Sequence, residues 1–490
     1  MRLSELMAGR SMPPTLLASG DPDIMGLTAD SRDVRPGWLF AAIPGTRQDG
    51  RAYIEDALAR GAVAVLTTPD AEERVHGRVP LLAEVDPRHG LAQLAATFYT
   101  PQPKTLAAVT GTNGKTSVAE FTRQMWAALG HEAASLGTLG VTRASGVEGP
   151  SLTTPDPVQL HTTLRDLARD GVDHAVIEAS SHGLDQARLD GVTVHAAAFT
   201  NLSRDHLDYH GSIDAYRAAK LRVFDRVAPD GIAVLNLDTA EYPAFAAAAA
   251  RKGLRILGYG QKTGAELRLA ARHARPGGQV IDIIALNRAR TVELPLIGDF
   301  QGWNALAALG LVIATGTPVT EALRALDALV GVRGRMERVA TLANGAAIYV
   351  DYAHTPDALE TMLRAVRPHT RGTLWCVFGC GGDRDPGKRP MMGKAVATAA
   401  DRPVVTDDNP RSENPAVIRA AALAACPGGE EIGGRAEAIT ATIRRLEPGD
   451  VLVIAGKGHE QGQDIGGTLH PFDDATIARD AVTAFEGGVS

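Results

Sequence analysis

A glycine-rich segment followed by Lys-Thr is the clearest candidate for chemistry in this sequence. It reads Thr110-Gly111-Thr112-Asn113-Gly114-Lys115-Thr116, between an apolar run over 106–109 that is typical of a strand and a helical pattern over 117–129. Glycines let backbone N–H groups face a phosphate, Lys115 adds charge, and the Thr116 hydroxyl can reach Mg²⁺. The usual spacing of such loops has glycine where this chain has Val109, and an ordinary glycine-rich turn is the alternative. The placement between strand and helix favours phosphate binding.

Two further strand ends offer metal ligands. Glu178 follows the apolar residues 175–177, and the segment 201–208, with Asp205 and His206, follows the apolar residues 196–199. A carboxylate and an imidazole beside a phosphate-binding loop can hold Mg²⁺ against transferring phosphates. The alternative is that Asp205 caps a helix and His206 is a partly buried histidine with satisfied hydrogen bonds. The neighbouring loop favours metal ligation.

The last third of the chain has two polar loops that suit an amino acid. Asp407-Asp408-Asn409-Pro410-Arg411 follows the apolar residues 404–405, and Gly456-Lys457-Gly458-His459-Glu460 follows 451–455. Arginine pairs with a carboxylate, and aspartate or glutamate pairs with an ammonium group. Taken alone, Asp-Asn-Pro is a common turn. The segment Gly379-Cys380-Gly381-Gly382-Asp383-Arg384 resembles a dinucleotide loop but lacks its last glycine, so it supports NAD or FAD only weakly.

Alternating strands and helices must position these loops. Apolar runs that end in turn residues and are followed by helical patterns predict mostly parallel sheets, whose ligands bind beyond the carboxyl ends of the strands. We expect an α/β protein of three domains over residues 1–103, 104–337 and 338–490. The first is a small α/β domain that ends at the proline-rich joint 100–103, the second a parallel sheet with the phosphate-binding loop (P-loop), and the third a Rossmann-like α/β domain.

Composition narrows the class of protein. The chain has 490 residues, 44% of them hydrophobic and 22% charged, which excludes a single small module and extensive disorder. Its net charge of -7 gives no broad basic surface for nucleic acid or an anionic membrane. Three cysteines form neither a disulfide framework nor a zinc pattern. No run approaches the roughly 18 apolar residues that span a bilayer, so we expect a cytoplasmic protein without membrane insertion.

Taken together, these motifs resemble those of the Mur ligases. The resemblance rests on the P-loop variant, residues 178–183, residues 201–206, Asp351-Tyr352-Ala353-His354-Thr355-Pro356 and residues 456–460, and it covers essentially the whole chain. It implies an ATP- and Mg²⁺-dependent ligase of peptidoglycan synthesis that acts through an acyl phosphate. It further implies that a monomer adds meso-2,6-diaminopimelate to UDP-N-acetylmuramoyl-L-alanyl-D-glutamate.

The same resemblance assigns roles to individual residues. The implied nucleotide contacts are Gly111, Thr112, Asn113, Gly114, Lys115, Thr116, Asn304, Arg335 and Asp351. The implied contacts to the UDP-muramoyl dipeptide are Ser31, Thr46, Arg47, Thr153, Thr154, Ser180, Gln186 and Arg188; Leu152 stands where relatives often have asparagine. The implied diaminopimelate contacts are Arg384, Asp408, Asn409, Pro410, Arg411, Gly456 and Glu460. Lys115, His206 and Lys220 are the implied catalytic residues.

Lys220 owes its role to the resemblance alone. The family carries the matching lysine as a carbamate, formed when a neutral amine adds CO₂, and the implied Mg²⁺ ligands are Thr116, Glu178, His206 and this carbamate. From its type and neighbours alone, Lys220 is expected to be a solvated helix residue.

Arg411 decides between related substrates. Diaminopimelate is lysine with an extra carboxylate, and the resemblance implies that relatives that add lysine lack this arginine. A lysine-adding homologue, a folylpolyglutamate-type ligase and a P-loop nucleotide switch that ligates nothing remain as alternatives.

Overall fold

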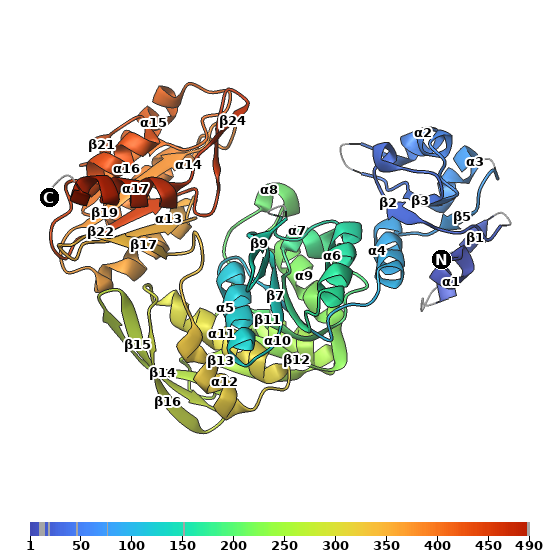
Figure 1. Ribbon diagram of the computed structural model, residues 1–490, viewed down its shortest axis with the longest axis horizontal. Coiled ribbons are helices and arrows are strands. Elements are labelled where there is room, and N and C mark those ends of the chain that lie inside the picture. The colour runs from blue at the N-terminus through green and yellow to red at the C-terminus, as the bar shows by residue number, and fades with distance from the viewer. Residues whose placement is uncertain (9–14, 18–19, 46–47, 76, 150–151, 488–490) are drawn as a thin grey trace. The chain divides into compact units, whose positions relative to one another are not determined.

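Short apolar strands alternate with helices through most of the computed structural model, which describes residues 1–8, 15–17, 20–45, 48–75, 77–149 and 152–487 (Figure 1). The chain divides into two compact units: Met1–Ala265 with Ala307–Ala322, and Glu266–Leu306 with Leu323–Ser490. Among the described residues, no helix is both long and apolar enough to cross a membrane.

The first unit begins with a five-stranded sheet in the order β1-β5-β4-β3-β2, in which only β1 runs antiparallel to its neighbour. Its core packs Leu39, Leu66 and Leu82 against Leu91 and Leu94 of helix α4. The elements of this part are α1 (Leu3–Ala8), β1 (Thr15–Leu17), β2 (Gly26–Thr28), β3 (Trp38–Ala41), α2 (Ile54–Ala59), β4 (Ala64–Thr67), α3 (Glu72–Val75), β5 (Leu81–Ala83) and α4 (Pro87–Phe98).

The larger sheet of the first unit follows in the order β13-β12-β11-β6-β10-β7-β8-β9. Its strands are parallel from β13 to β7, and β8 and β9 add an antiparallel edge. The strands are β6 (Thr105–Thr110), β7 (Ala133–Gly137), β8 (Gly140–Arg143), β9 (Gly146–Glu148), β10 (His174–Glu178), β11 (Val194–Phe199), β12 (Val227–Asn236) and β13 (Arg255–Gly260). The expected strands over 106–109, 175–177 and 196–199 are confirmed as parts of β6, β10 and β11.

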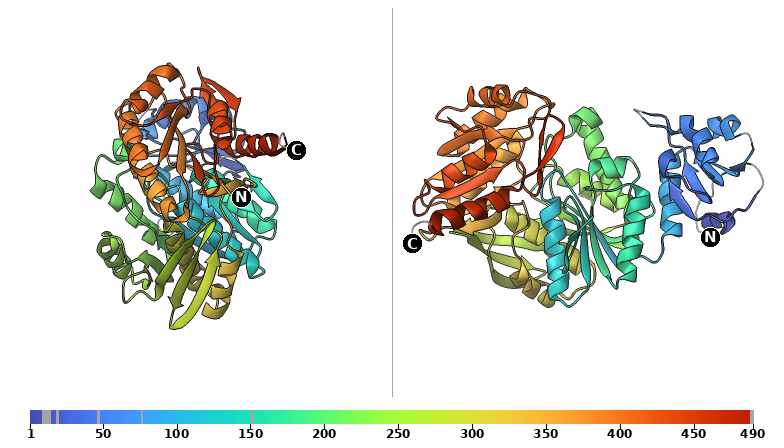
Figure 2. Two further views of the ribbon diagram at one scale, coloured as in Figure 1. Left: turned by 90° about the vertical axis from the view of Figure 1, so that its left-hand side faces the viewer. Right: turned by 45° about the horizontal axis from the view of Figure 1, so that its top comes forward.

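Helices cover both faces of this sheet, as its continuous apolar strands require. Helix α6 packs Leu160, Leu164 and Leu167 onto one face, while α5 lies on the other side of the strands (Figure 1 and the right view of Figure 2). The helices are α5 (Lys115–Ala128), α6 (Pro157–Arg169), α7 (Ser181–Asp185), α8 (Leu207–His210), α9 (Ile213–Leu221) and α10 (Tyr242–Arg251). Helices α11 (Phe300–Ala314) and α12 (Val319–Ala325) are divided between the two units.

The second unit contains a six-stranded sheet in the order β17-β18-β22-β19-β20-β21, parallel except at β17. Helices α13, α14 and α15 pack on one face and α16 and α17 on the other. The elements are β17 (Glu337–Thr341), β18 (Ala347–Asp351), α13 (Pro356–Val366), β19 (Leu374–Cys380), α14 (Lys388–Ala399), β20 (Arg402–Asp407), α15 (Pro415–Leu423), β21 (Glu430–Glu431), α16 (Arg435–Ile443), β22 (Val451–Ala455) and α17 (Asp474–Gly487). The expected strands over 347–350, 374–378 and 451–455 are therefore confirmed.

Two antiparallel elements complete the second unit. The strands β14 (Leu267–Arg275), β15 (Gly278–Ala285) and β16 (Arg288–Leu294) form a meander. The strands β23 (Gly462–Ile465) and β24 (Thr468–Pro471) form a hairpin. Residue 411 makes an isolated parallel bridge to residue 465, so this hairpin is connected to the loop after β20.

Candidate functional site

The glycine-rich loop after β6 has the conformation that its sequence predicts. Gly111 and Gly114 have φ angles of +150° and +88°, which favour glycine. A Cβ atom on Gly111 would lie 1.8 Å from Oγ1 of Thr200, so no larger residue fits. Lys115 Nζ folds back and donates to the carbonyl oxygens of Gly111 and Thr112, each at 2.9 Å. The loop thus places a lysine ammonium group at the start of α5.

The end of β11 fixes this loop from the neighbouring strand. The N–H of Thr112 donates to the carbonyl oxygen of Asn201 at 2.8 Å, and the N–H of Asn113 donates to the side-chain Oδ1 of Asn201 at 3.0 Å. Thr200 Oγ1 donates to the carbonyl oxygen of Asn113 at 2.7 Å. The supporting role of Thr200 was not predicted, although the residue directly precedes the polar segment 201–208.

Glu178 ends β10 as a buried carboxylate beside the loop, with a relative exposure of 2%. Its Oε2 accepts from Thr116 Oγ1 at 3.1 Å and from Thr138 Oγ1 at 3.2 Å, and its Oε1 accepts from the N–H of Thr138 at 2.9 Å. A Cβ atom on Gly137 would lie 2.0 Å from Oε1, so this glycine makes room for the carboxylate. The structure therefore brings together Thr116 and Glu178, two of the predicted oxygen ligands, and adds Thr138 as a support. Hard oxygen donors of this kind fit Mg²⁺.

His206 lies at the same edge of the sheet but is not gathered with Glu178 into a set of three ligands among the described residues. It adopts a left-handed conformation with φ of +51° at the N-cap of α8, and its ring packs edge-on against His182 at 4.8 Å. Burial lowers its pKa despite Asp205, whose Oδ2 lies 3.4 Å from Nε2. The alternative that Asp205 caps a helix is wrong, because His206 occupies that position.

Lys220 on α9 is buried, with a relative exposure of 1%, so the expectation of a solvated helix residue is wrong. Its Nζ donates to the carbonyl oxygen of Gly111 at 2.7 Å and lies 4.5 Å from the centre of the Tyr216 ring. Burial, and then the nearby charge of Lys115, hold the pKa of Lys220 well below its ordinary value. Because the helix turns this side chain under the P-loop, a lysine that its sequence neighbours do not distinguish becomes part of the site.

The predicted contacts to the muramoyl dipeptide form one hydrogen-bonded network. Thr154 Oγ1 lies 2.9 Å from Ser180 Oγ, and Arg188 Nη1 donates to the carbonyl oxygen of Thr154 at 2.8 Å. Arg188 Nη2 donates to Oε1 of Gln186 at 2.8 Å. Thr153 Oγ1 lies 2.9 Å from the hydroxyl of Thr138, which connects the network to the Glu178 carboxylate.

In the first unit, after β2, Ser31 is buried with a relative exposure of 7%. It begins a short 3-10 helix that Asp30 caps by accepting the N–H of Arg32. Arg32 lowers the pKa of Asp30 to about 2. Thr46 and Arg47, the other predicted uridine-nucleotide contacts, lie outside the described residues.

In the second unit, the predicted amino-acid contacts meet around Gly381, at the carboxyl end of β19. A Cβ atom on Gly381 would lie 3.0 Å from Arg411 Nη1, 3.5 Å from Arg384 Cγ and 3.8 Å from Asp408 Oδ2. Arg411 Nη1 donates to the carbonyl oxygen of Gly382 at 2.7 Å. Gly382 is itself constrained, because a Cβ atom there would lie 1.9 Å from the carbonyl oxygen of Pro410. The Arg411 guanidinium, the aliphatic stem of Arg384 and the Asp408 carboxylate thus surround one small residue.

Lys457 is the residue of this site that the sequence did not identify. Its side chain is completely buried, and its Nζ donates to Oδ1 of Asn409 at 2.9 Å. The same Nζ lies 3.5 Å from Oδ1 of Asp408 and 3.5 Å from Oε2 of Glu460. One lysine therefore connects three of the predicted contacts, and the signal for it was its place between Gly456 and Gly458 in the loop already selected.

The predicted nucleotide contacts of the second unit lie next to this loop or on α11. The Asp351 carboxylate accepts the N–H groups of Met336 and Ala353, each at 2.8 Å, and burial raises its pKa. The N–H of Gly456 donates to the carbonyl oxygen of Asp351 at 3.1 Å. Arg335 lies over the ring of Tyr352 at 4.5 Å. Asn304 is buried, and its Nδ2 donates to Oε1 of Gln301 at 3.0 Å.

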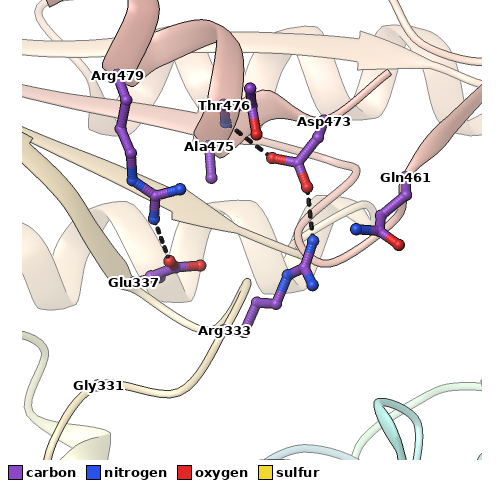
Figure 3. Close-up of a pocket in the computed structure, with 8 residues that line it drawn as sticks. All are labelled: Gly331, Arg333, Glu337, Gln461, Asp473, Ala475, Thr476 and Arg479. Atoms are coloured by element: carbon purple, nitrogen blue, oxygen red, sulfur yellow. Dashed lines mark hydrogen bonds and ion pairs between the residues drawn. The ribbon is translucent and has the colours of Figure 1, made fainter. Parts of the chain in front are cut away.

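A pocket of about 480 Å³ lies elsewhere in the second unit, and none of the predicted site residues lines it (Figure 3). Its charged side chains pair with one another: Arg333 with Asp473 at 2.6 Å, and Arg479 with Glu337 at 2.9 Å. Because the pairs satisfy these charges internally, we assign the pocket no ligand.

Family models match this chain in three consecutive segments. Residues 23–99 match "Mur ligase family, catalytic domain", residues 109–312 match "Mur ligase middle domain", and residues 334–458 match "Mur ligase, glutamate ligase domain". Together they span all the predicted site residues apart from Glu460.

Relatives and solved structures extend this similarity over the full chain. The UDP-N-acetylmuramoyl-L-alanyl-D-glutamate--2,6-diaminopimelate ligase of Zymomonas mobilis is 50% identical over 489 residues, covering 97% of this chain and 100% of the relative. The ligase of the same name from Caulobacter vibrioides is 52% identical over 474 residues, covering 95% and 96%.

A solved structure of a ligase of this name is 34% identical with a TM-score of 0.72, covering 94% of this chain and 95% of that one. A Mycobacterium tuberculosis folylpolyglutamate synthase shares the fold at 21% identity, with a TM-score of 0.62 and coverage of 82% and 95%. The chain therefore belongs to the Mur ligase family and has its three-domain α/β fold.

Proposed function

We propose that this chain adds meso-2,6-diaminopimelate to UDP-N-acetylmuramoyl-L-alanyl-D-glutamate in the cytoplasm, with ATP hydrolysed to ADP and phosphate, during peptidoglycan synthesis. The observation that carries the proposal is the meeting of Arg384 and Arg411 at Gly381, beside the acidic groups connected by Lys457. Diaminopimelate has two carboxylates and two ammonium groups, so it needs cationic and anionic contacts within one small site.

The reaction is an activation followed by a displacement. An oxygen of the D-Glu γ-carboxylate attacks the γ-phosphorus of ATP, and ADP leaves to give an acyl phosphate. The diaminopimelate amine then attacks the acyl carbon, phosphate leaves, and the nitrogen loses a proton to give the amide. The loop with Lys115 stabilises the charge on the transferring phosphoryl group, and the network from Arg188 to Thr153 positions the dipeptide.

The metal ligands in this proposal are Thr116, Glu178, His206 and a carbamate on Lys220. Bound there, Mg²⁺ neutralises part of the negative charge on the phosphates. Only an unprotonated amine adds CO₂, and the burial that holds the pKa of Lys220 well below its ordinary value favours this form. Incubation with ¹³C-bicarbonate should give a carbamate carbon signal that is lost in Lys220→Met. The same signal in both proteins would contradict this assignment.

The substrates divide among the three segments in the proposal. Residues 1–103, with Ser31, Thr46 and Arg47, bind the uridine nucleotide. Residues 104–337 bind the ATP phosphates and the dipeptide, and residues 338–490 bind diaminopimelate, with Arg335 and Asp351 contacting ATP from either side of the boundary. We propose that the protein works as a monomer, and molar mass measured by light scattering tests this.

Phosphate release in matched reactions tests the function. The purified protein is incubated with ATP, Mg²⁺ and either the UDP dipeptide or a folate acceptor, together with diaminopimelate, lysine or glutamate, and the products are weighed by mass spectrometry. We expect a tripeptide product with diaminopimelate and at least tenfold slower release with lysine. Faster release with lysine would favour a lysine-adding enzyme, product only with glutamate and a folate acceptor would favour a folylpolyglutamate-type ligase, and hydrolysis indifferent to both substrates would indicate a nucleotide switch.

A further inference from the structure

Two histidines and an aspartate gather at the edge of the central sheet opposite the P-loop. His131 lies in the connection between α5 and β7, Asp173 directly precedes β10, and His174 begins it. Their ligand atoms all lie within 4.8 Å of one another. No other set of three His, Cys, Asp or Glu side chains is gathered in this way in the part of the chain that the structure describes.

The carboxylate of Asp173 presents one oxygen to each imidazole. Its Oδ2 lies 3.4 Å from Nδ1 of His131, and its Oδ1 lies 3.0 Å from Nδ1 of His174. Ligand atoms around a tetrahedral ion with bonds of about 2.0 Å lie about 3.3 Å apart, so both spacings match the edge of such a shell. Two imidazoles with one carboxylate suit Zn²⁺ and similar transition metals, whereas Mg²⁺ prefers oxygen donors.

The close contact between Asp173 Oδ1 and His174 Nδ1, at 3.0 Å, does not have the direction of a hydrogen bond. Asp173 Oδ1 and His174 Nδ1 are shielded from solvent, and neither makes a well-directed hydrogen bond within the described residues. Buried polar atoms without such partners are uncommon, and an ion or a water often occupies the site that they face. A cation between these two atoms would satisfy both of them.

Backbone hydrogen bonds hold the main chain of the three residues in place without help from an ion. The N–H groups of Asp173 and His174 both donate to the carbonyl oxygen of Glu132, at 3.0 Å and 3.2 Å. The N–H of His131 donates to the carbonyl oxygen of Trp126 at 3.0 Å, and the rings of His131 and His174 are 3.9 Å apart. Ligands that are already ordered lose little entropy on binding, which favours affinity.

We infer that His131, Asp173 and His174 bind a divalent transition-metal ion of the Zn²⁺ class, with water completing the coordination. The site is structural, since His174 begins β10 and Glu178 ends it. At about 3.3 Å per residue, the two side chains lie about 13 Å apart along one strand. The ion crosslinks the start of β10 and the loop that leads into β7. It takes no part in phosphate transfer.

Titration with Zn²⁺ alone tests the inference, using tag-free, metal-free, full-length protein and isothermal calorimetry. The test variant is His131→Asn with His174→Asn, and the matched control is His273→Asn with His470→Asn, two exposed histidines elsewhere. Asp173→Asn, which keeps the shape of the side chain, serves as a second test variant if the double variant unfolds. Because the histidines near His206 remain in every protein, any zinc bound there contributes equally.

The expected result is that the test variant binds one Zn²⁺ fewer per chain than the wild type, or binds the corresponding ion at least tenfold more weakly. The control should match the wild type, and Co²⁺ should give the visible absorption of a tetrahedral site only where the three ligands are intact. Equal stoichiometry and affinity in the wild type and both test variants would overturn the inference. So would a loss of zinc in the control equal to that in the test variant.

Discussion

Replacing Arg411 by alanine should abolish the preference for diaminopimelate over lysine without weakening ATP binding. The guanidinium group is held beside Gly381, because its Nη1 donates to the carbonyl oxygen of Gly382 at 2.7 Å. A guanidinium group has five N–H donors, so two N–H groups of Arg411 remain to bind the additional carboxylate of diaminopimelate. Arg411 has φ of +50°, and alanine meets the same backbone strain as arginine, whereas glycine would relieve it.

The size of the effect follows from the surroundings of this side chain. Truncating one partner of a buried charged pair costs about 2–5 kcal/mol. The Arg411 side chain has a relative exposure of 25%, and its Nε lies 4.0 Å from Oδ2 of Asp464. Because the side chain is only partly buried, we expect a cost in the lower part of that range. A loss of about 2–3 kcal/mol lowers kcat/KM for diaminopimelate about 30- to 160-fold, at 1.36 kcal/mol per tenfold.

Steady-state phosphate release measures this loss with diaminopimelate, lysine and ATP varied in turn. The KM for ATP and the kcat/KM for lysine should stay within about threefold of the wild type. Arg411→Lys keeps the charge but loses the fork, and should fall between wild type and alanine. Arg444→Ala, at an exposed position on the same unit, is the control. Equal losses for diaminopimelate and lysine would refute the reasoning that Arg411 binds the extra carboxylate.

Three further predictions concern buried polar groups. Lys457→Met removes the donor that connects Asp408 with Glu460, and kcat/KM for diaminopimelate should fall more than tenfold in the phosphate-release assay while the KM for ATP is unchanged; equal changes would contradict this. Asp474→Asn leaves the fully buried Arg435 without its carboxylate, which should cost about 3–5 kcal/mol of unfolding free energy in urea, against no change for the exposed Glu437→Gln. Burial lowers the pKa of His161 to about 4. Between pH 6.5 and about 4 the unfolded chain therefore binds a proton at this residue that the folded protein does not bind. The free energy of unfolding keeps its full value above pH 6.5 and decreases as the pH falls through this range. His161→Gln should therefore reduce the slope of unfolding free energy between pH 6 and 4.5 by about 1.4 kcal/mol per pH unit, and an unchanged slope would refute it.

The sequence predicts the parallel strands well, for a physical reason. Strands covered by helices on both faces are continuously apolar, so runs such as 175–177 and 451–455 are recognisable without any partner. Their polar ends then locate Glu178 and the loop at Gly456. The meander β14–β16 was not predicted, because residues 267–275 contain no continuous apolar run and their apolar/polar alternation is interrupted at 270–271, where the strand register shifts.

The supports of the site are less predictable than the residues that they support. Thr138 lies in a turn and Thr200 directly follows β11, and nothing in their neighbours indicates that their hydroxyls or N–H groups bind Glu178 or the P-loop. Their roles depend on which strands are adjacent: β10 lies beside β6 and β7, and β6 lies beside β11. Adjacency in a parallel sheet is a property of topology, which local patterns do not contain.

Lysine is the residue type for which sequence reasoning failed most clearly, because a lysine is normally expected in solvent. Here Lys220 and Lys457 are both buried at the carboxyl ends of parallel strands, yet their surroundings differ in charge. Lys220 faces a carbonyl oxygen and lies near the cationic Lys115, so the fold favours its neutral amine, a nucleophile toward CO₂. Lys457 Nζ lies 3.5 Å from a carboxylate oxygen of Asp408 and 3.5 Å from one of Glu460, so it connects the two acidic side chains. Burial alone therefore does not define the role of a lysine in this protein, because one buried lysine lies beside a carbonyl oxygen and a cation and the other lies between two carboxylates.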